Sequence, residues 1–256
     1  MILDNILSKV KARIKEQKET MSLDYLQRAM LGAYEPRNVI EALSGRYNII
    51  AEIKKASPSR GVICEDFHPL NIAQEYEKAG ASAISVLTEP YYFQGDIEYL
   101  GTIRRFTNSI LLRKDFLIDP YQIARARLYG ADFVLLIARI LKGESLKEMI
   151  SYAKSIKMQA LVEVHNEAEL GAALDGGADI IGINHRDLDT LTIDMSLTQR
   201  LIGMIPRDKI IVAESGINSR AVMDSLNAMG VNAFLIGEYF MQANSPGQAL
   251  KELLGR

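Results

Sequence analysis

The chain has 256 residues, of which 48% are hydrophobic, and its formal net charge at pH 7 is −2. This charge excludes the strongly basic surface that nucleic-acid binding requires, and no apolar run approaches the roughly 18 residues of a membrane span. A single cysteine, Cys64, excludes an intrachain disulfide, and the first residues lack a signal peptide, so we expect a cytoplasmic protein.

The first 47 residues are predicted to form helices ahead of any strand. Between Leu3 and Ile14, apolar residues recur at helical spacing with charged residues between them, which indicates an amphipathic helix. Ser22 is a suitable N-cap for a second helix that runs to about Met30. We expect residues 1–47 to be an N-terminal helical extension that caps the following domain, lies across its active-site mouth or mediates dimerisation.

From residue 48 onwards, a short apolar run followed by a helical stretch occurs eight times. Such alternation predicts a parallel sheet with helices outside it, and eight units predict an α/β protein with a closed (β/α)8 TIM barrel over residues 48–256. Extension and barrel together are expected to form a single domain. The predicted strands are Asn48–Ile53, Ala83–Leu87, Ile110–Leu112, Phe133–Ile137, Ala160–Val164, Ile180–Ile183, Ile210–Ala213 and Ala233–Ile236.

A barrel of this kind carries its chemistry at the C-terminal ends of its strands, so the polar residues that follow each run are candidate site residues. The first loop, residues 56–61, is long and rich in turn residues, and we expect it to be more than a connector. The segment 237–244 has room for one short extra helix, which many barrels use to bind a phosphate.

Glu52 and Lys54 bracket Ile53, and the strand period of two points both side chains to the same face. A buried Glu and Lys are costly unless they pair or act in catalysis. They are therefore either a structural ion pair or an acid–base and anion-binding pair at the mouth. Lys114, after the third run, is a candidate general acid or else a surface lysine. Arg113 alternates with it and is expected to face the helices or solvent.

Polar residues also end the fifth and sixth runs. Glu163 can transfer protons at the mouth, or it is a structural carboxylate paired with a neighbouring lysine. Asn184 can orient a hydroxyl or a water, and Arg186 can hold its loop to a nearby acid. The histidines lack the spacing of metal ligands, so we expect no metal site. Two of them, His68 and His165, are predicted to be loop residues.

Glycines follow the last two runs. Gly216 comes after Glu214 and Ser215, and it permits a tight turn and close approach of the backbone to a ligand. Gly237 opens the short extra helix. Glycines after strands seven and eight together can present backbone N–H groups to a phosphate, although both could be simple turns.

Six motifs lie in register on the predicted strands and the loops after them. They are Glu52–Ser59, Ser85–Gly95, Leu112–Phe116, Leu161–Val164, Gly182–Leu188 and Ala213–Ile217. Together they resemble the indole-3-glycerol-phosphate synthase family of tryptophan biosynthesis. The resemblance covers nearly the whole chain in order, including the helical extension, and six motifs in register make it specific.

The resemblance implies a carboxy-lyase that needs neither cofactor nor metal. Its substrate would be a small anion, 1-(2-carboxyphenylamino)-1-deoxyribulose 5-phosphate. The enzyme would close the indole ring and expel carbon dioxide and water, giving indole-3-glycerol phosphate. We expect a monofunctional protein with no nucleic-acid or membrane partner, as a monomer or at most a weak homodimer.

The resemblance also implies roles for single residues. Lys114 matches the lysine that protonates the ketone oxygen, and Glu163 matches the acid–base group of ring closure and dehydration. Lys54 matches a lysine near the substrate carboxylate and the reacting carbonyl, and which lysine donates which proton stays open. The other implied site residues are Glu52 and Asn184, which position lysines and sugar hydroxyls; Phe93, Arg186, Glu214 and Ser215, which bind substrate; and Ser57, Gly216, Gly237 and Glu238, which bind phosphate.

Three positions, His68, His185 and Glu238, depart from the family pattern, and three kinds of alternative function remain open. Glu238 lies where some members carry a serine phosphate ligand, so we expect its carboxylate to point away and its N–H to contribute. Phosphoribosylanthranilate isomerase and the tryptophan synthase alpha subunit share the phosphate cradle but not the Glu-x-Lys motif. A Schiff-base aldolase would use Lys114 as its nucleophile. A non-catalytic sugar-phosphate-binding protein would not require the set of acids and lysines.

Overall fold

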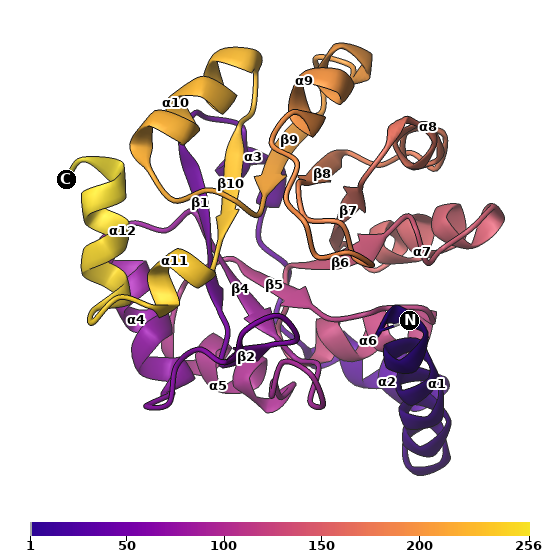
Figure 1. Ribbon diagram of the computed structural model, residues 1–256. Coiled ribbons are helices and arrows are strands. Elements are labelled where there is room, and N and C mark those ends of the chain that lie inside the picture. Colours follow the sequence, from indigo (N-terminus) through magenta and orange to yellow (C-terminus); the bar gives the residue numbers. More distant parts are fainter. Residues whose placement is uncertain (1) are drawn as a thin grey trace.

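The computed structural model describes residues 2–256, and its centre is a closed barrel of eight parallel strands (Figure 1). The barrel order is β1-β10-β9-β8-β7-β6-β5-β4, and β1 pairs with β4 to close it. The TIM-barrel prediction is confirmed. The barrel strands are β1 (Asn48–Ile53), β4 (Ala83–Leu87), β5 (Leu111–Lys114), β6 (Phe133–Ile137), β7 (Gln159–Val164), β8 (Ile180–Asn184), β9 (Ile210–Glu214) and β10 (Ala233–Ile236).

Three strands extend further toward the C-terminal mouth than predicted. Lys114, Asn184 and Glu214 are the last residues of their strands rather than the first residues of loops. Lys114 pairs with Leu87 of β4, and Asn184 pairs with Glu214 across the β8–β9 ladder. The backbones of these three polar residues are therefore fixed by the barrel itself.

Helices cover the outside of the barrel, and glycines end several of them. Gly80 and Gly230 take left-handed φ values of 88° and 116° at the C-caps of α4 and α10, a conformation that favours glycine. No helix within residues 2–256 is long and apolar enough to cross a membrane. The outer helices are α4 (Pro69–Ala79), α5 (Glu98–Phe106), α6 (Pro120–Leu128), α7 (Glu144–Ser155), α8 (Glu167–Asp175), α9 (Leu197–Leu201), α10 (Arg220–Met229) and α12 (Pro246–Leu254).

Smaller elements complete the loops. The first barrel loop contains a hairpin of β2 (Ala56–Ser57) and β3 (Gly61–Val62), so it is more than a connector. The predicted extra helix after β10 is α11 (Glu238–Met241). A 3₁₀ turn, η2 (Ile202–Met204), follows α9.

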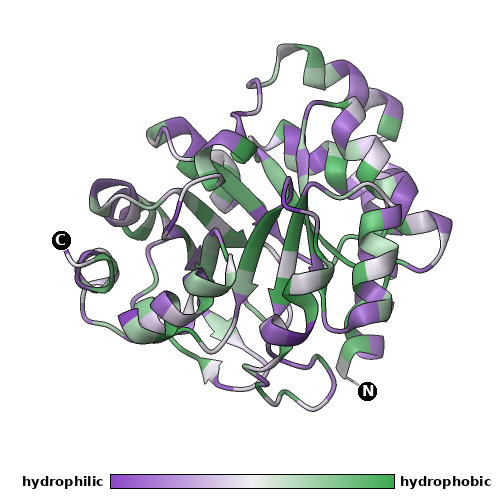
Figure 2. Cartoon of the chain, turned by 90° about the horizontal axis from the view of Figure 1, so that it is seen from above, coloured by the Kyte–Doolittle hydropathy of each residue, from purple (hydrophilic) through white to green (hydrophobic). Residues whose placement is uncertain are grey.

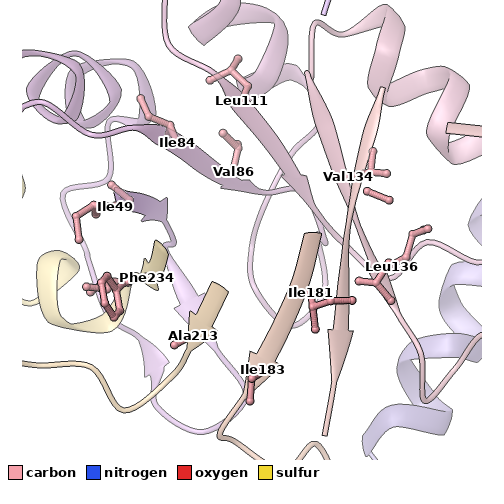
Figure 3. Packing of buried hydrophobic residues seen from close by; sticks show 14 of the residues in the cluster. Ile49, Ile84, Val86, Leu111, Val134, Leu136, Ile181, Ile183, Ala213 and Phe234 are labelled. Carbon is pink, nitrogen blue, oxygen red and sulfur yellow. The ribbon is translucent and has the colours of Figure 1, made fainter. Parts of the chain in front are cut away.

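Alternation along the strands divides the core into two layers. Ile49 and Ile84 belong to the layer between strands and helices, which Figure 3 shows from close by. Ile50 and Leu161 belong to a second layer inside the barrel. Because both faces are buried, the strands are almost uniformly apolar, whereas the surrounding helices mix apolar and hydrophilic residues (Figure 2).

The N-terminal extension contacts both ends of the barrel. It consists of α1 (Ile2–Thr20), α2 (Leu23–Ala29), the 3₁₀ turn η1 (Met30–Gly32) and α3 (Val39–Leu43); residue 1 of the predicted extension lies outside the described residues. Helices α1 and α2 pack on α6 (Figure 1). Val39 and Leu43 are fully buried in the cluster that contains Ala83 and Ala233, the first residues of two strands. Helix α3 therefore closes the bottom of the barrel. Capping of the barrel was one of the three arrangements considered for the extension.

Buried Asp132, immediately before β6, connects the extension to the bottom of the barrel. Its carboxylate accepts backbone N–H groups of Arg37 at 2.8 Å and Leu111 at 2.7 Å. It also forms an ion pair with Arg104 of α5, which is 3% exposed. One carboxylate thus joins the extension, β5 and α5.

Asp132→Ala is expected to lower the free energy of unfolding by about 3–5 kcal/mol, because it leaves the Arg104 charge buried without its partner. Urea denaturation followed by far-UV circular dichroism measures this change. Asp208, whose side chain is 75% exposed, is the matched control, and Asp208→Ala should change stability by less than about 0.5 kcal/mol. Equal effects of the two substitutions would contradict the role of Asp132.

Candidate active site

A pocket of about 520 Å³ opens at the C-terminal ends of the barrel strands. All thirteen site residues predicted from the sequence line it, although they come from positions 52 to 238 of the chain. The barrel topology explains this convergence, since parallel strands bring their C-terminal ends to one face. The thirteen residues are Glu52, Lys54, Ser57, Phe93, Lys114, Glu163, Asn184, Arg186, Glu214, Ser215, Gly216, Gly237 and Glu238.

Glu52 lies between the two lysines of the pocket. Its carboxylate oxygens are 2.8 Å from Lys54 Nζ and 3.5 Å from Lys114 Nζ. Glu52 is 3% exposed, so the ion pairs are largely desolvated. The structure therefore contains the ion pair considered above and directs it into the pocket, where both lysines are also available to a ligand.

These contacts shift the pKa values of Glu52 and Lys114. Burial raises the pKa of the Glu52 carboxyl, but the charges and hydrogen bonds of Lys54 and Lys114 outweigh burial and bring it to about 2. Burial lowers the pKa of Lys114, but the charges of Glu52, Glu214 and Glu163 more than reverse this effect and raise it. Without a ligand, Glu52 is thus ionised and Lys114 holds its proton.

The lowered pKa of Glu52 predicts a contribution to acid stability. A carboxyl whose pKa falls on folding stabilises the protein above its unfolded pKa, here 4.5, and loses that contribution as the pH falls toward 2. The contribution is up to about 3 kcal/mol. Glu52→Gln should therefore flatten the decline of unfolding free energy between pH 4.5 and 2, as measured by urea denaturation. The exposed control Glu144→Gln should keep the wild-type slope; a wild-type slope in Glu52→Gln would refute the assignment.

Glu163 and Glu214 form a second group of carboxyls, and each is 1% exposed. Burial and the adjacent Glu163 charge raise the pKa of Glu214 well above its usual value, which favours its protonated form. A Cβ at Gly182 of β8 would overlap Glu214 Oε1, so this glycine makes room for the carboxyl. The arrangement can accept a proton at one carboxyl while the other donates.

His165 shows what the sequence prediction omitted. Its backbone lies in a bend after β7, as a loop residue would, but its side chain is only 3% exposed. The imidazole lies between Glu163 and Glu169, with Nε2 at 3.3 Å from Glu163 Oε1 and Nδ1 at 3.0 Å from Glu169 Oε2. The signal was present in the sequence, because Glu163 and His165 are two residues apart at a strand end. Glu163 thus contacts a histidine and a carboxyl rather than the lysine partner considered above.

The loop after β9 has a fixed conformation. Ser215 and Gly216 take left-handed φ values of 65° and 74°. The Ser215 hydroxyl donates a 2.8 Å hydrogen bond to Asn184 Oδ1, and the same oxygen accepts the backbone N–H of Arg186 at 3.0 Å. His185 is buried and contacts the Ser215 carbonyl at 3.0 Å. Asn184 thus connects the loops after β8 and β9, and the serine hydroxyl is engaged within the site.

The second glycine loop approaches Glu52. A Cβ at Gly237 would overlap Glu52 Oε1 and lie 3.0 Å from the Glu52 Cβ. The absence of a side chain at this position therefore serves the carboxylate as well as any bound anion. Ser57 of β2, which is 9% exposed, lines the same pocket.

Glu238 also lines the pocket. Its carboxylate oxygens lie 3.0 Å from Arg60 Nη2 and 3.6 Å from Arg186 Nη2. The acid expected to hold the Arg186 loop is therefore Glu238. Two arginines balance its charge, and Arg60 is a pocket residue that the sequence prediction did not single out.

An apolar side of the pocket lies beside the N-terminal extension. Phe93 and Phe116 are in contact, with ring centroids 6.3 Å apart, and Leu3 and Ile6 of α1 line the same pocket. The beginning of α1 thus reaches the mouth, which was a second arrangement considered for the extension. This side can accept a flat aromatic ring.

Asp115 holds α1 in place beside the mouth. It is 2% exposed and pairs with Arg113 at 2.9 Å and with Arg13 of α1 at 3.0 Å. Arg113 also donates a 2.7 Å hydrogen bond to the Gln122 carbonyl of α6, so it faces the helices as predicted. In residues 2–256, no group of three or more His, Cys, Asp and Glu side chains is arranged to hold a metal ion.

Known proteins similar in sequence share one description. The sequence profile of the family described as "Indole-3-glycerol phosphate synthase" matches residues 3–253. A protein of that name from Campylobacter fetus is 54% identical over 257 residues, which cover 100% of both chains. Another of that name, from Sulfurimonas denitrificans, is 50% identical over 258 residues, covering 99% of this chain and 98% of the relative.

Solved structures agree on the fold. The crystal structure of KGPDC from Streptococcus mutans superposes with a TM-score of 0.64 at 14% identity, over 82% of this chain and 96% of that chain. The structure of 3-hexulose-6-phosphate synthase from Salmonella typhimurium gives a TM-score of 0.64 at 14% identity, over 81% and 98% of the two chains. These distant similarities show the fold alone, whereas the sequence matches over the full length show that the chain belongs to the indole-3-glycerol phosphate synthase family, the decarboxylating lyases of tryptophan biosynthesis.

Proposed function

We propose that the pocket at the barrel mouth binds 1-(2-carboxyphenylamino)-1-deoxyribulose 5-phosphate and converts it to indole-3-glycerol phosphate. The observation that carries this assignment is the group of two lysines and three glutamates, all in one pocket of about 520 Å³. Protonation of a ketone and later loss of water require both proton donors and acceptors within reach of one ligand. A protein that only binds a sugar phosphate has no use for this number of buried ionisable groups.

The two ends of the substrate fit opposite sides of the pocket. The phosphate meets the loops that contain Gly216 and Gly237, together with Ser57, and the Glu238 backbone N–H adds a donor there. The anthranilate ring lies against Phe93, and the Leu3 side chain covers it from α1. This orientation leaves the ketone in the middle of the pocket, near the lysines.

Ring closure begins at the ketone. The aromatic carbon that carries the carboxylate attacks the ketone carbon, and Lys114 donates its proton to the ketone oxygen as the new carbon–carbon bond forms. Lys114 suits this step because it holds its proton in the resting enzyme. Lys54 lies on the other side of Glu52 and binds the substrate carboxylate until carbon dioxide leaves with the bond electrons returning to the ring.

Dehydration completes the indole. The hydroxyl made from the ketone departs as water after it receives a proton, and a base removes a proton from the substrate to form the ring double bond. Glu163 is that base, and protonated Glu214 is the adjacent donor. Asn184 and Arg186 hold the sugar hydroxyls, and Ser215 fixes the orientation of Asn184.

We also propose that the protein acts in the cytoplasm as a monomer or weak homodimer, without nucleic-acid or membrane partners. A net charge of −2 and a single cysteine support this proposal. Residues 1–47 and 48–256 would fold as one unit, since Val39 and Leu43 of the extension are buried at the bottom of the barrel.

An indole-fluorescence assay tests the function directly. The chain contains no tryptophan, so a rise in indole emission on adding the substrate reports the product without tryptophan emission from the protein. We expect a rise without added metal or cofactor. Borohydride trapping in the presence of a keto-sugar phosphate tests the aldolase alternative, and a covalent adduct at Lys114 would overturn the acid role. No rise from folded protein that still binds phosphate would refute the synthase assignment.

A further inference from the structure

The buried imidazole beside Glu163 has no role in the steps above. His165 Nε2 lies 3.3 Å from Glu163 Oε1, and the two side chains are 3% and 2% exposed. Within residues 2–256, His165 Nε2 and Glu163 Oε1 are both buried, and neither atom has a hydrogen-bond partner. An unpartnered nitrogen therefore lies within ion-pair distance of an unpartnered oxygen of the carboxyl that is proposed to act as the base.

The opposite side of the imidazole is held by Glu169 of α8. Glu169 Oε2 lies 3.0 Å from His165 Nδ1 and accepts the backbone N–H of His165 at 2.8 Å. Burial raises the pKa of Glu169, but hydrogen bonds and charge from His165 and a hydrogen bond from Arg139 outweigh burial, so its pKa is lowered. Glu169 is thus a carboxylate, which places the N–H of a neutral imidazole on Nδ1.

Glu169 is itself fixed from behind. Arg139, after β6, contacts Glu169 Oε1 at 3.2 Å and Asp187 at 3.1 Å, and Asn166 donates to Glu169 Oε1 at 2.9 Å. The imidazole therefore cannot turn without breaking several contacts.

The protonation of the imidazole determines whether a proton lies between His165 Nε2 and Glu163 Oε1. With a proton on Nδ1, a neutral imidazole presents the Nε2 lone pair to Glu163. A lone pair facing an ionised carboxylate at 3.3 Å is repulsive, so one proton must lie between the two atoms. That proton makes the contact attractive whether it resides on nitrogen or on oxygen.

We propose that His165 is a positioning residue that shares one proton with Glu163. This inference rests on the proposed acid–base role of Glu163. His165 holds Glu163 Oε1 from the side of α8, and the rest of the carboxyl faces Glu214 and the pocket. The charged and titratable groups around the pair are Glu169 and Arg139 behind the imidazole, and Glu214 and Lys114 in the pocket.

Two amide substitutions distinguish positioning of Glu163 from a merely structural role. The side-chain nitrogen of glutamine reaches roughly the position of Nε2, whereas that of asparagine reaches roughly the position of Nδ1. His165→Gln can therefore still donate to Glu163, and His165→Asn can still donate only to Glu169. We expect kcat for His165→Gln to stay within about threefold of wild type, and kcat for His165→Asn to fall by at least about tenfold. The loss is part of the roughly 10²–10⁴-fold rate increase that a general acid–base group contributes. KM should stay unchanged in both.

The reverse order would overturn the proposal, because it would show that the contact with Glu169 is what matters. Equal kcat values in wild type and both variants would overturn it too. His68, whose side chain is 67% exposed, is the matched control, and His68→Gln should leave kcat unchanged. If wild-type protein shows no turnover at all, the proposed function fails, and the spectroscopic measurement below still tests the contact.

Nitrogen-15 NMR of the imidazoles tests the shared proton without catalysis. The chain has three histidines, so each signal is assignable with single substitutions. Replacing Glu163 by glutamine removes the carboxyl beside Nε2, so the nitrogen-15 chemical shift of His165 Nε2 at a fixed pH should change. The signals of His68 should stay where they are in the wild type. An unchanged His165 Nε2 signal in Glu163→Gln would overturn the proposal.

Discussion

Replacing Lys114 with alanine is expected to lower kcat by about 10²–10⁴-fold, the contribution of a positioned general acid. The lysine ends β5, holds its proton and lies 3.5 Å from Glu52. No other described lysine contacts Glu52 from this side of the pocket, since Lys54 approaches the other carboxylate oxygen. The indole-fluorescence assay under saturating substrate measures the loss.

Binding of the phosphate should survive the same substitution, because its proposed cradle is formed by the loops after β9 and β10. Isothermal titration with the substrate should give a Kd within about tenfold of wild type. A change of this size corresponds to the loss of one charge–charge contact in a partly solvated site. Lys147→Ala is the control, since that side chain is 62% exposed on α7. Near-normal turnover in Lys114→Ala would remove this residue from the mechanism.

Gly237→Asp is expected to impair both binding and chemistry. The new carboxylate would face the substrate phosphate and raise KM by about 10–10³-fold. This range corresponds to the repulsion between two like charges about 4 Å apart in a medium of intermediate dielectric constant. The new Cβ would also overlap the Glu52 carboxylate, so kcat should fall as well. Steady-state kinetics at several substrate concentrations separates the two effects.

Gly237→Ala isolates the steric part of this prediction. It adds the Cβ without the charge, so kcat should fall while KM changes much less than in Gly237→Asp. Gly203→Asp is the control, because a Cβ at Gly203 meets no atom within 4 Å. An unchanged KM in Gly237→Asp would move the phosphate to another part of the pocket.

Much of the barrel could be predicted because its strands are buried on both faces and are therefore continuous apolar runs. The ends of β5, β8 and β9 were predicted too short, since Lys114, Asn184 and Glu214 are polar although they pair in the sheet. Helix α3 was missed because its five residues are too few to show a helical period. The burial of α3 depends on contacts with the bottom of the barrel, which residues distant in the sequence form.

The strand-end residues of the pocket followed from the topology, whereas Ser57, Phe93 and Glu238 followed only from the family resemblance. Alternation alone placed Glu52 and Lys54 on one face. The connections between them did not follow, because they join distant segments. Arg13 and Asp115 are 102 positions apart and meet only when α1 packs beside β5. His165 acquires its partner only when Glu169 of α8 folds back onto the strand end. Such contacts depend on how helices pack on the barrel, which local pattern does not encode.

The positions of the two chain ends bear on how the protein can be joined to other molecules. Leu3 lines the substrate pocket, whereas the Arg256 side chain lies against Gly80, which precedes β4 at the bottom of the barrel. A purification tag, fluorophore or surface tether attached ahead of α1 would sit at the entrance used by the substrate. The same attachment after α12 leaves that entrance open, so immobilised or fused forms of this enzyme should be built from the carboxyl end.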